Sequence, residues 1–202
     1  MSDDLATHWP ALLAAIAARL APHSELAVFS EELRACSGVA PVAAAEEGAS
    51  LGVARHWPVA ISADPLGRLV AKVTLGLQQL GHGWLQNPNY REAPPHPDFL
   101  ANYGYREWLG PNAGFHSADF RLGILVLGPG TLYPLHHHPA DEVYLPLGPG
   151  RWFKDGMGWQ DRVAGDVIHH PPHCGHATES GDAPLAAIYL WRGSITQAAE
   201  IV

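Results

Sequence analysis

The chain has 202 residues, of which 47% are hydrophobic and only 16% are charged, enough apolar material for one packed domain with or without a helical extension. The formal net charge is −8 and lysine and arginine form no cluster, so we expect no nucleic-acid partner and no binding to an anionic membrane. The Met-Ser-Asp-Asp start lacks the basic segment of a secretory signal, and Cys36 and Cys174 form no CxxC pair. These features predict a cytoplasmic protein without a disulfide framework.

The first part of the chain is predicted to be helical. Apolar residues recur at helical spacing over 5–20, and Pro22 ends the segment. This run is shorter than a membrane span and carries Arg19, so we interpret it as an amphipathic helix. A second short helix is predicted over 24–36.

The middle of the chain alternates between irregular and helical patterns. Residues 37–61, rich in alanine, glycine and proline, are predicted to be a loop. Asp64-Pro65 then begins a third helix, with an apolar stripe that ends near Gly81. Residues 84–117 contain several proline dipeptides and a group of aromatic residues. We expect an aromatic loop there that covers one end of the following domain, lines a pocket, contacts a second copy, or simply connects the two parts.

From residue 120 onward, short strand-like segments are separated by turn residues. The predicted strands are 120–127, 132–135, 142–147, 151–154, 166–169, 176–179 and 185–191. This pattern is typical of an all-β barrel, whose interior can hold a small ligand. We predict a mostly β fold in which residues 1–117, the N-terminal helices and the aromatic loop, pack on a barrel of residues 118–202 as one structural unit.

The stretch between Gly130 and Gly148 carries the strongest chemical signal. His136 and His138 stand one residue apart, and Glu142 and Tyr144 follow. Because alternate residues of a strand share a face, these side chains can converge on one point. Two imidazoles and a carboxylate suit a first-row divalent metal. We therefore predict a metal site here, with His137 on the opposite face in a structural role.

A second motif, further along the chain, brings another histidine. Together the two segments read Gly-x5-His-x-His-x3-Glu-x5-Gly and Gly-x5-Pro-x4-His, the second ending at His176. This pair resembles the motifs of the cupin superfamily, small jelly-roll barrels (double-stranded β-helices) that hold one metal on three histidines and a glutamate. The resemblance implies the following ligands: His136, His138, Glu142 and His176.

The match to the cupin motifs has two departures, neither of which removes a ligand. The first motif usually ends one residue later, and the second usually has glycine where His173 stands. His169, His170 and His173 are open to two interpretations, as cavity-lining residues or as hydrogen-bonded barrel residues. Cys174 could approach the metal or serve as a small buried filler.

Three aromatic residues narrow the resemblance. Tyr133 precedes the histidines, Tyr144 follows the glutamate by two residues, and Trp191 ends the last predicted strand. With helices before the barrel and the string Tyr-Pro-x-His-His-His-Pro-Ala-x-Glu-x-Tyr, the chain resembles the cupin-type dimethylsulfoniopropionate (DMSP) lyases, most closely their short marine bacterial form. The similarity covers roughly residues 115–193; the helical region agrees in type only.

The resemblance implies a carbon–sulfur lyase that splits DMSP, a small zwitterion, into dimethyl sulfide and acrylate by β-elimination. One divalent transition metal, Fe(II), Mn(II) or Zn(II), would bind the substrate carboxylate, and Tyr144 would remove the α-proton. Tyr133 and Trp191 would hold the sulfonium by cation–π attraction. Two alternatives remain, an Fe(II)-dependent dioxygenase with the same ligands and a non-catalytic metal-binding sensor. A monomer or a homodimer is expected.

Overall fold

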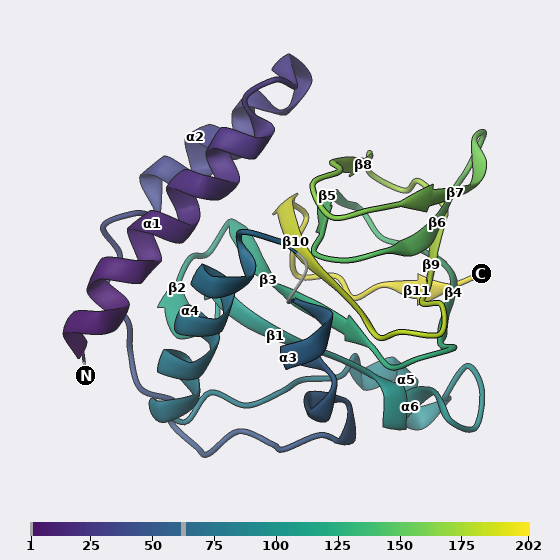
Figure 1. Ribbon diagram of the computed structural model, residues 1–202, viewed down its shortest axis with the longest axis horizontal. Helices are drawn as coiled ribbons and strands as arrows, with labels where there is room; N and C mark the ends of the chain where they lie inside the picture. Colours follow the sequence, from purple (N-terminus) through teal and green to yellow (C-terminus); the bar gives the residue numbers. More distant parts are fainter. Residues whose placement is uncertain (1, 62–63) are drawn as a thin grey trace.

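The computed structural model describes residues 2–61 and 64–202, with a helical first part and a sheet-rich second part (Figure 1). The helices are α1 (Ser2–Leu20), α2 (Ala27–Ala35), α3 (Trp57–Ala60), α4 (Gly67–Gln79), α5 (Pro88–Glu92) and α6 (Phe99–Asn102), with 3-10 turns at Ser24–Leu26 and Gly52–Arg55. In these described ranges no helix combines the length and the apolar character that crossing a bilayer demands. The helices predicted at 5–20 and 24–36 are confirmed.

The second part consists of two facing sheets. The strands are β1 (Tyr103–Gly110), β2 (Phe115–His116), β3 (Phe120–Leu127), β4 (Leu132–His137), β5 (Ala140–Pro146), β6 (Gly150–Lys154), β7 (Gly158–Arg162), β8 (Ile168–His170), β9 (His176–Glu179), β10 (Leu185–Gly193) and β11 (Glu200–Ile201). One sheet has the order β2-β1-β3-β10-β5-β8 and the other β11-β4-β9-β6-β7. The chain therefore folds as the predicted cupin barrel.

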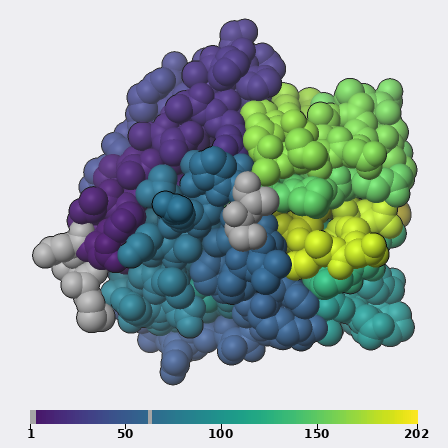
Figure 2. Space-filling model, viewed as in Figure 1, coloured from purple at the N-terminus to yellow at the C-terminus, as the bar shows by residue number. Residues whose placement is uncertain are grey.

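The helices cover the part of the six-stranded sheet that extends beyond the barrel. Helix α1 packs against α2 and α4, and its buried face carries Trp9, whose ring stacks on Phe115 of β2 at a centroid distance of 3.9 Å. Figure 2 shows one face of the molecule, on which the N-terminal half (purple and blue) lies beside the green and yellow barrel strands. Because the two parts share one continuous hydrophobic core, the helices support the sheet that carries the site.

The predicted loop over residues 84–117 is wrong in detail. It contains α5 and α6, and its second half forms β1 and β2, so the sheet begins at Tyr103, ahead of the expected boundary at residue 118. Nearly every residue of β1 is buried, because the barrel covers one face and the helices cover the other. A strand covered on both faces shows no polar alternation, which is the signal that sequence reading relies on.

Smaller differences have local causes. Helix α4 begins at Gly67, three residues later than Asp64; the Asp64 carboxylate instead accepts a hydrogen bond from the Leu66 N–H at 2.7 Å. Strand β7 was not predicted because it is polar and half exposed, and it pairs with β6 through a turn whose Gly156 and Gly158 have positive φ. Strand β11, also unpredicted, is a two-residue edge on β4.

Candidate metal centre

The site is built around Glu142, which lies on β5 with no exposed surface. The strand register places Trp191 of β10 beside it on one side and His170 of β8 on the other. The Trp191 Nε1–H donates to Glu142 Oε1 at 2.5 Å, and His170 Nδ1 lies 3.3 Å from Oε2. Cross-strand neighbours on one face of a sheet meet in this way, so the pairing of three strands frames the carboxylate.

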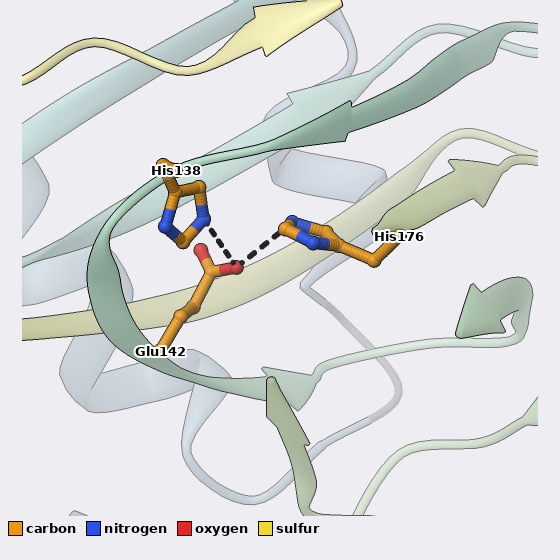
Figure 3. A group of neighbouring side chains, drawn as sticks. All are labelled: His138, Glu142 and His176. Carbon is orange, nitrogen blue, oxygen red and sulfur yellow. Dashed lines mark hydrogen bonds and ion pairs between the residues drawn. The ribbon is translucent and has the colours of Figure 1, made fainter. Parts of the chain in front are cut away.

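Two further histidines reach the same carboxylate oxygen from the opposite sheet. His138 follows β4 in the turn to β5, and His176 is the first residue of β9. The Nε2 atoms of both lie 3.1 Å from Glu142 Oε2, and Figure 3 shows the rings approaching that oxygen from two sides. The ligand atoms of these three residues all lie within 4.8 Å of one another. The structure therefore brings together three of the four predicted ligands.

The hydrogen bonds of these imidazoles fix their tautomers. Nδ1 of His138 lies 3.1 Å from the Ala140 carbonyl oxygen, and Nδ1 of His176 lies 2.9 Å from that of Cys174. A carbonyl oxygen only accepts, so we assign the ring proton to Nδ1 in both and a lone pair to Nε2. Backbone carbonyls orient metal-binding histidines in the same manner.

These tautomers direct three sets of lone pairs at one point. The two Nε2 atoms and Glu142 Oε2 repel one another unless a proton or a metal cation lies between them. The buried Nε2 of His176 has no hydrogen-bond donor among the described residues, and neither has that of His170. Two or three imidazoles and a carboxylate are a donor set that divalent transition metals accept, so the residues present fit such an ion.

The charge state of the site follows from its burial. Burial by itself would raise the pKa of Glu142, but His138 and the other imidazoles in contact with it hold that pKa well below its ordinary value. Burial lowers the pKa of His170 to about 4 and that of His136 well below its ordinary value. At neutral pH Glu142 is therefore ionised, with the neutral imidazoles of His136 and His170 nearby, and its negative charge favours a cation.

His136, the fourth predicted ligand, lies beside this group and not in it. It is paired with His176 in the β4–β9 register, and the two ring centroids are 4.1 Å apart, while His138 is 6.4 Å away. Its ring stacks on Tyr133 at 3.9 Å. The sequence argument relies on the alternation of side chains along a single strand, but His136 lies on β4 of one sheet and Glu142 on β5 of the other.

Of the remaining histidines near the site, one belongs to it and two do not. His170 belongs to the site: its ring stacks on that of His176 at 4.1 Å and it contacts Glu142, a role that the sequence left open. His169 points the other way and pairs with Asp141 at 2.7 Å. His173 is exposed, and its ring lies 6.4 Å from that of His137.

Cys174 is half-buried, and its backbone carbonyl, not its thiol, contacts the site. Its carbonyl oxygen accepts the hydrogen bond from Nδ1 of His176, whereas its thiol donates to the carbonyl of Gly175. Burial raises the pKa of the thiol, which keeps it protonated and a poor metal ligand. The chain therefore uses Cys174 to orient a ligand.

A cavity of about 280 Å³ opens beside the carboxylate. It brings together Glu142 and all three aromatic residues singled out in the sequence, Tyr133, Tyr144 and Trp191. Three more tyrosines complete the aromatic wall: Tyr103, Tyr105 and Tyr189. The segment 195–199 closes another side, and Glu107 and Arg121, joined by an ion pair of 2.8 Å, form the polar remainder. The region expected to be an aromatic loop thus lines this cavity from β1.

Tyr144 lies two residues beyond Glu142 on the same face of β5, with its ring centroid 5.8 Å from that of His170. Burial, together with the charge of Glu142, raises the pKa of its hydroxyl well above the ordinary value. Tyr133 is similarly buried, and its hydroxyl is 3.0 Å from that of Tyr90. Both phenols are neutral in this environment unless positive charge is placed next to them.

Comparisons with known proteins give a consistent result. The family model for dimethylsulfoniopropionate lyase matches residues 30–187. The DMSP lyase DddQ of Ruegeria pomeroyi is 31% identical over 102 residues, which are 50% of this chain and 51% of that protein, so the match spans about half of the curated relative.

Solved structures extend the likeness to the whole fold. The crystal structure of DddQ from Ruegeria pomeroyi superposes with a TM-score of 0.72 at 22% identity, covering 97% of this chain and 96% of that one. A structure described with the DMSP lyases RdDddP and RnDddQII gives a TM-score of 0.71 at 21% identity, with both chains fully covered. At this level of identity the superpositions establish the shared fold.

Proposed function

Because this chain belongs to the dimethylsulfoniopropionate lyase family, we propose that it cleaves DMSP to dimethyl sulfide and acrylate. The observation that supports this best is the single cavity in which Glu142, Tyr144, Tyr133 and Trp191 meet. Glu142, which the histidines contact from behind, lies at the cavity, and a group of aromatic rings lines the same space. This arrangement suits a small zwitterion, whose carboxylate and sulfonium need opposite surroundings.

We assign the metal to His138, Glu142 and His176, with His136 as the fourth ligand. The buried, unpartnered Nε2 of His176 and the convergent lone pairs support this assignment. A bound divalent cation, Fe(II), Mn(II) or Zn(II), would supply positive charge that attracts the substrate carboxylate, acidifies its α-proton and favours the Tyr144 phenolate. Trp191 and the backbone carbonyls hold the ligands in orientation.

Tyr144 is the proposed base. As the phenolate, its oxygen accepts the proton from the substrate carbon next to the carboxylate and becomes the neutral hydroxyl, and the electrons of that C–H bond form the carbon–carbon double bond of acrylate. The bond from the β-carbon to sulfur breaks and its electrons go to sulfur, which leaves as neutral dimethyl sulfide. The leaving group therefore needs no proton, and the one on Tyr144 returns to water.

The aromatic wall is the proposed site for the sulfonium. Tyr133 and Trp191 line the cavity, and the tyrosine rings of β1 and β10 add to them. A cation over such a face gains about 0.5–2 kcal/mol per ring, more when water is excluded. Tyr133 is held in place by its stacking on His136, and Trp191 by its hydrogen bond to Glu142.

The proposal is tested by measuring dimethyl sulfide in the headspace over the purified protein with DMSP. The assay is run with Fe(II), Mn(II) and Zn(II), and with and without oxygen. Release under anaerobic conditions separates a lyase from the alternative dioxygenase, and any product formation separates it from a sensor. Absence of dimethyl sulfide with every metal would refute the proposed activity.

The role of Tyr144 has a matched control on the neighbouring strand. Tyr189 lies directly opposite Tyr144 in the β5–β10 register and lines the same cavity. We expect Tyr144→Phe to lower kcat by at least about 10²-fold, the usual scale of a lost general base, with unchanged metal content. Tyr189→Phe removes an equally buried hydroxyl and is expected to stay within a few-fold of the parent. Equal losses in the two variants would remove Tyr144 from the role.

A further inference from the structure

A second hollow lies on the other face of β1. Tyr105 and Glu107 line the cavity described above, and because side chains alternate along a strand, Arg106 between them points to the opposite face. There it lines a separate space of about 610 Å³, bordered by the 47–57 and 78–84 segments. This hollow has no residue in common with the candidate metal centre.

Arg106 is a buried cation without an anion. Its side chain is 2% exposed, and no carboxylate in the described part of the chain pairs with it. Nη1 donates to the Thr74 carbonyl oxygen at 3.0 Å and to Gln78 Oε1 at 3.4 Å. The guanidinium lies over the Trp84 ring, 4.9 Å from its centroid. Removing a charge from water without a counter-charge is unfavourable by several kcal/mol, so such a group is rare unless something else balances it.

One edge of the guanidinium remains free. Nε is buried and has no acceptor within residues 2–61 and 64–202, and Nη2 has none there either. These two nitrogens form a planar pair of donors, the geometry that binds two oxygens of a carboxylate or phosphate at once. Burial lowers the pKa of Arg106 to about 10, which still leaves it charged at neutral pH.

The walls of the hollow are fixed in place by the backbone. Gly48 donates to the Gly81 carbonyl at 2.7 Å, and Trp84 donates to that of Ala49 at 2.9 Å. Gly48 and Gly83 pass so closely that a Cβ at Gly48 would lie 2.0 Å from the nitrogen of Gly83. The two segments are therefore held together and the opening beside them is preformed.

The charges that face the hollow favour an anion. Arg55 is exposed and adds a second guanidinium, whose Nη1 donates to the Gly52 carbonyl at 3.1 Å. Glu47 is the acid of the lining and is exposed to water, where its charge is screened. The Nε2 of His82 is engaged with the Val42 carbonyl at 2.8 Å. The balance is one buried and one exposed cation against one exposed carboxylate.

We propose that this hollow is a binding site for a small oxyanion, a carboxylate or a phosphate, held by the Nε–Nη2 edge of Arg106 with Arg55 in support. The site is independent of the lyase proposal, since it lies on the other face of β1 and its test measures binding and not turnover. An anion there would complete the hydrogen bonds of Arg106 and stabilise the contact between α4, the 47–57 segment and the sheet.

The test compares the parent protein with Arg106→Met, which keeps the apolar length of the side chain and removes its charge. Thermal unfolding is followed as inorganic phosphate or acetate is added, with sodium chloride holding ionic strength constant. We expect a saturable rise in the midpoint for the parent and at least a tenfold weaker response for Arg106→Met, since two charge-assisted hydrogen bonds are lost. Phosphate and acetate titrations distinguish the two ligand classes.

The matched control is a variant with the same net charge as Arg106→Met. Arg151 is an exposed arginine on β6 whose guanidinium lies 5.0 Å from the Trp159 ring centroid, so Arg151→Met removes one cation and one cation–π contact elsewhere. It should respond to anions as the parent does. Equal responses of the parent and Arg106→Met would overturn the proposal. Calorimetric titration of the unmodified protein decides the matter even if the variant fails to fold, because no saturable binding of phosphate or acetate would also overturn it.

Discussion

Two buried charges of opposite sign, Glu142 in the barrel and Arg106 behind β1, have contrasting surroundings. Glu142 is contacted by three imidazoles and an indole N–H, and its pKa is held low. Arg106 is met by two neutral oxygens and an indole face, with no carboxylate. The same physical rule applies to both sites: a charge removed from water needs a partner.

The two sites fail that rule in opposite directions. Around Glu142 there are more lone pairs than protons, because Nδ1 of His138 and of His176 are committed to carbonyls. Around Arg106 there are more N–H groups than acceptors. The first surplus calls for a cation and the second for an anion. Counting donors and acceptors therefore indicates which charge each site would accept.

The largest expected effect is that of Glu142→Gln. An amide cannot supply the negative charge that balances a divalent ion, so we expect bound metal, measured by elemental analysis, to fall to background, and dimethyl sulfide release with it. Asp141→Asn is the matched control: the neighbouring carboxylate points away and pairs with His169 and Arg192. It should keep its metal. Full metal content in Glu142→Gln would contradict the comparison with Arg106, because metal binding would then not depend on the buried negative charge.

The second largest effect is expected on acidification of the metal-free protein, where His170 should make stability depend on pH and Arg106 should not. The pKa of His170 is about 4 in the folded chain against 6.5 as its ordinary value, so the unfolded chain takes up the proton first. Stability is then fully present above about pH 6.5 and is lost as the pH falls toward 4, by about 3 kcal/mol at about 1.4 kcal/mol per pH unit. Arg106 stays charged over this range and contributes no such slope.

Urea unfolding after chelation, from pH 7.5 to 4.5, measures this slope. His170→Gln cannot take up the proton and should reduce the slope to the part that His136 contributes. The control, His8→Gln, changes a half-buried histidine of α1 that is paired with Asp4, and it should keep the slope of the parent. If His170→Gln and the parent lost stability in parallel, proton uptake elsewhere would be responsible.

A smaller effect is expected from Trp191→Phe. The substitution keeps a ring near His138, whose centroid lies 4.1 Å from that of the indole, but removes the N–H that donates to Glu142 Oε1. Loss of such an outer hydrogen bond typically weakens metal binding about 10- to 100-fold. A competition titration with a coloured chelator measures it, and Trp159→Phe at an exposed site of β7 serves as the control. Unchanged affinity would mean that the imidazoles alone orient the carboxylate.

The sequence predicted a helix or strand only where the apolar residues of that element show a clear period. Periodic apolar residues located α1, α2 and most barrel strands, because one face of each is buried and the other is not. The same reasoning missed β1, which is covered on both faces. Arg106 was hidden in the same segment, where a single arginine among aromatic residues carries no signal of burial.

The site residues show the same contrast between local patterns, which the sequence reveals, and strand pairing, which it does not. Three of the predicted ligands, His138, Glu142 and His176, lie within two local motifs, and the structure brings them together. His170 was left open, since its contact with Glu142 depends on the pairing of β5 with β8, a register that no local pattern specifies. The position of His136 beside the group and not in it depends on the change of sheet between β4 and β5, which no local pattern specifies.

The departure at His173, by contrast, was visible in the sequence and has a physical consequence. The cupin-like motif has glycine at this position, and His173 is the non-glycine residue of the described chain that adopts a positive φ, 63°. Left-handed backbone is unfavourable for a residue with a Cβ by about 1–2 kcal/mol. The His173 N–H donates to the carbonyl oxygen of His138 at 2.8 Å, which connects the turn to a proposed metal ligand.

The smallest predicted effect is therefore a gain in stability. His173→Gly keeps the N–H that bonds to His138 and removes the strain, so the free energy of unfolding should rise by about 1 kcal/mol in urea, with metal content unchanged. Pro172→Gly, one residue earlier, is the control: it frees a position whose φ the ring already fixes and should lower stability instead. A loss of stability in His173→Gly would show that the imidazole, near His137, contributes more than its backbone strain removes, and that this chain has replaced the turn's glycine by a side-chain contact.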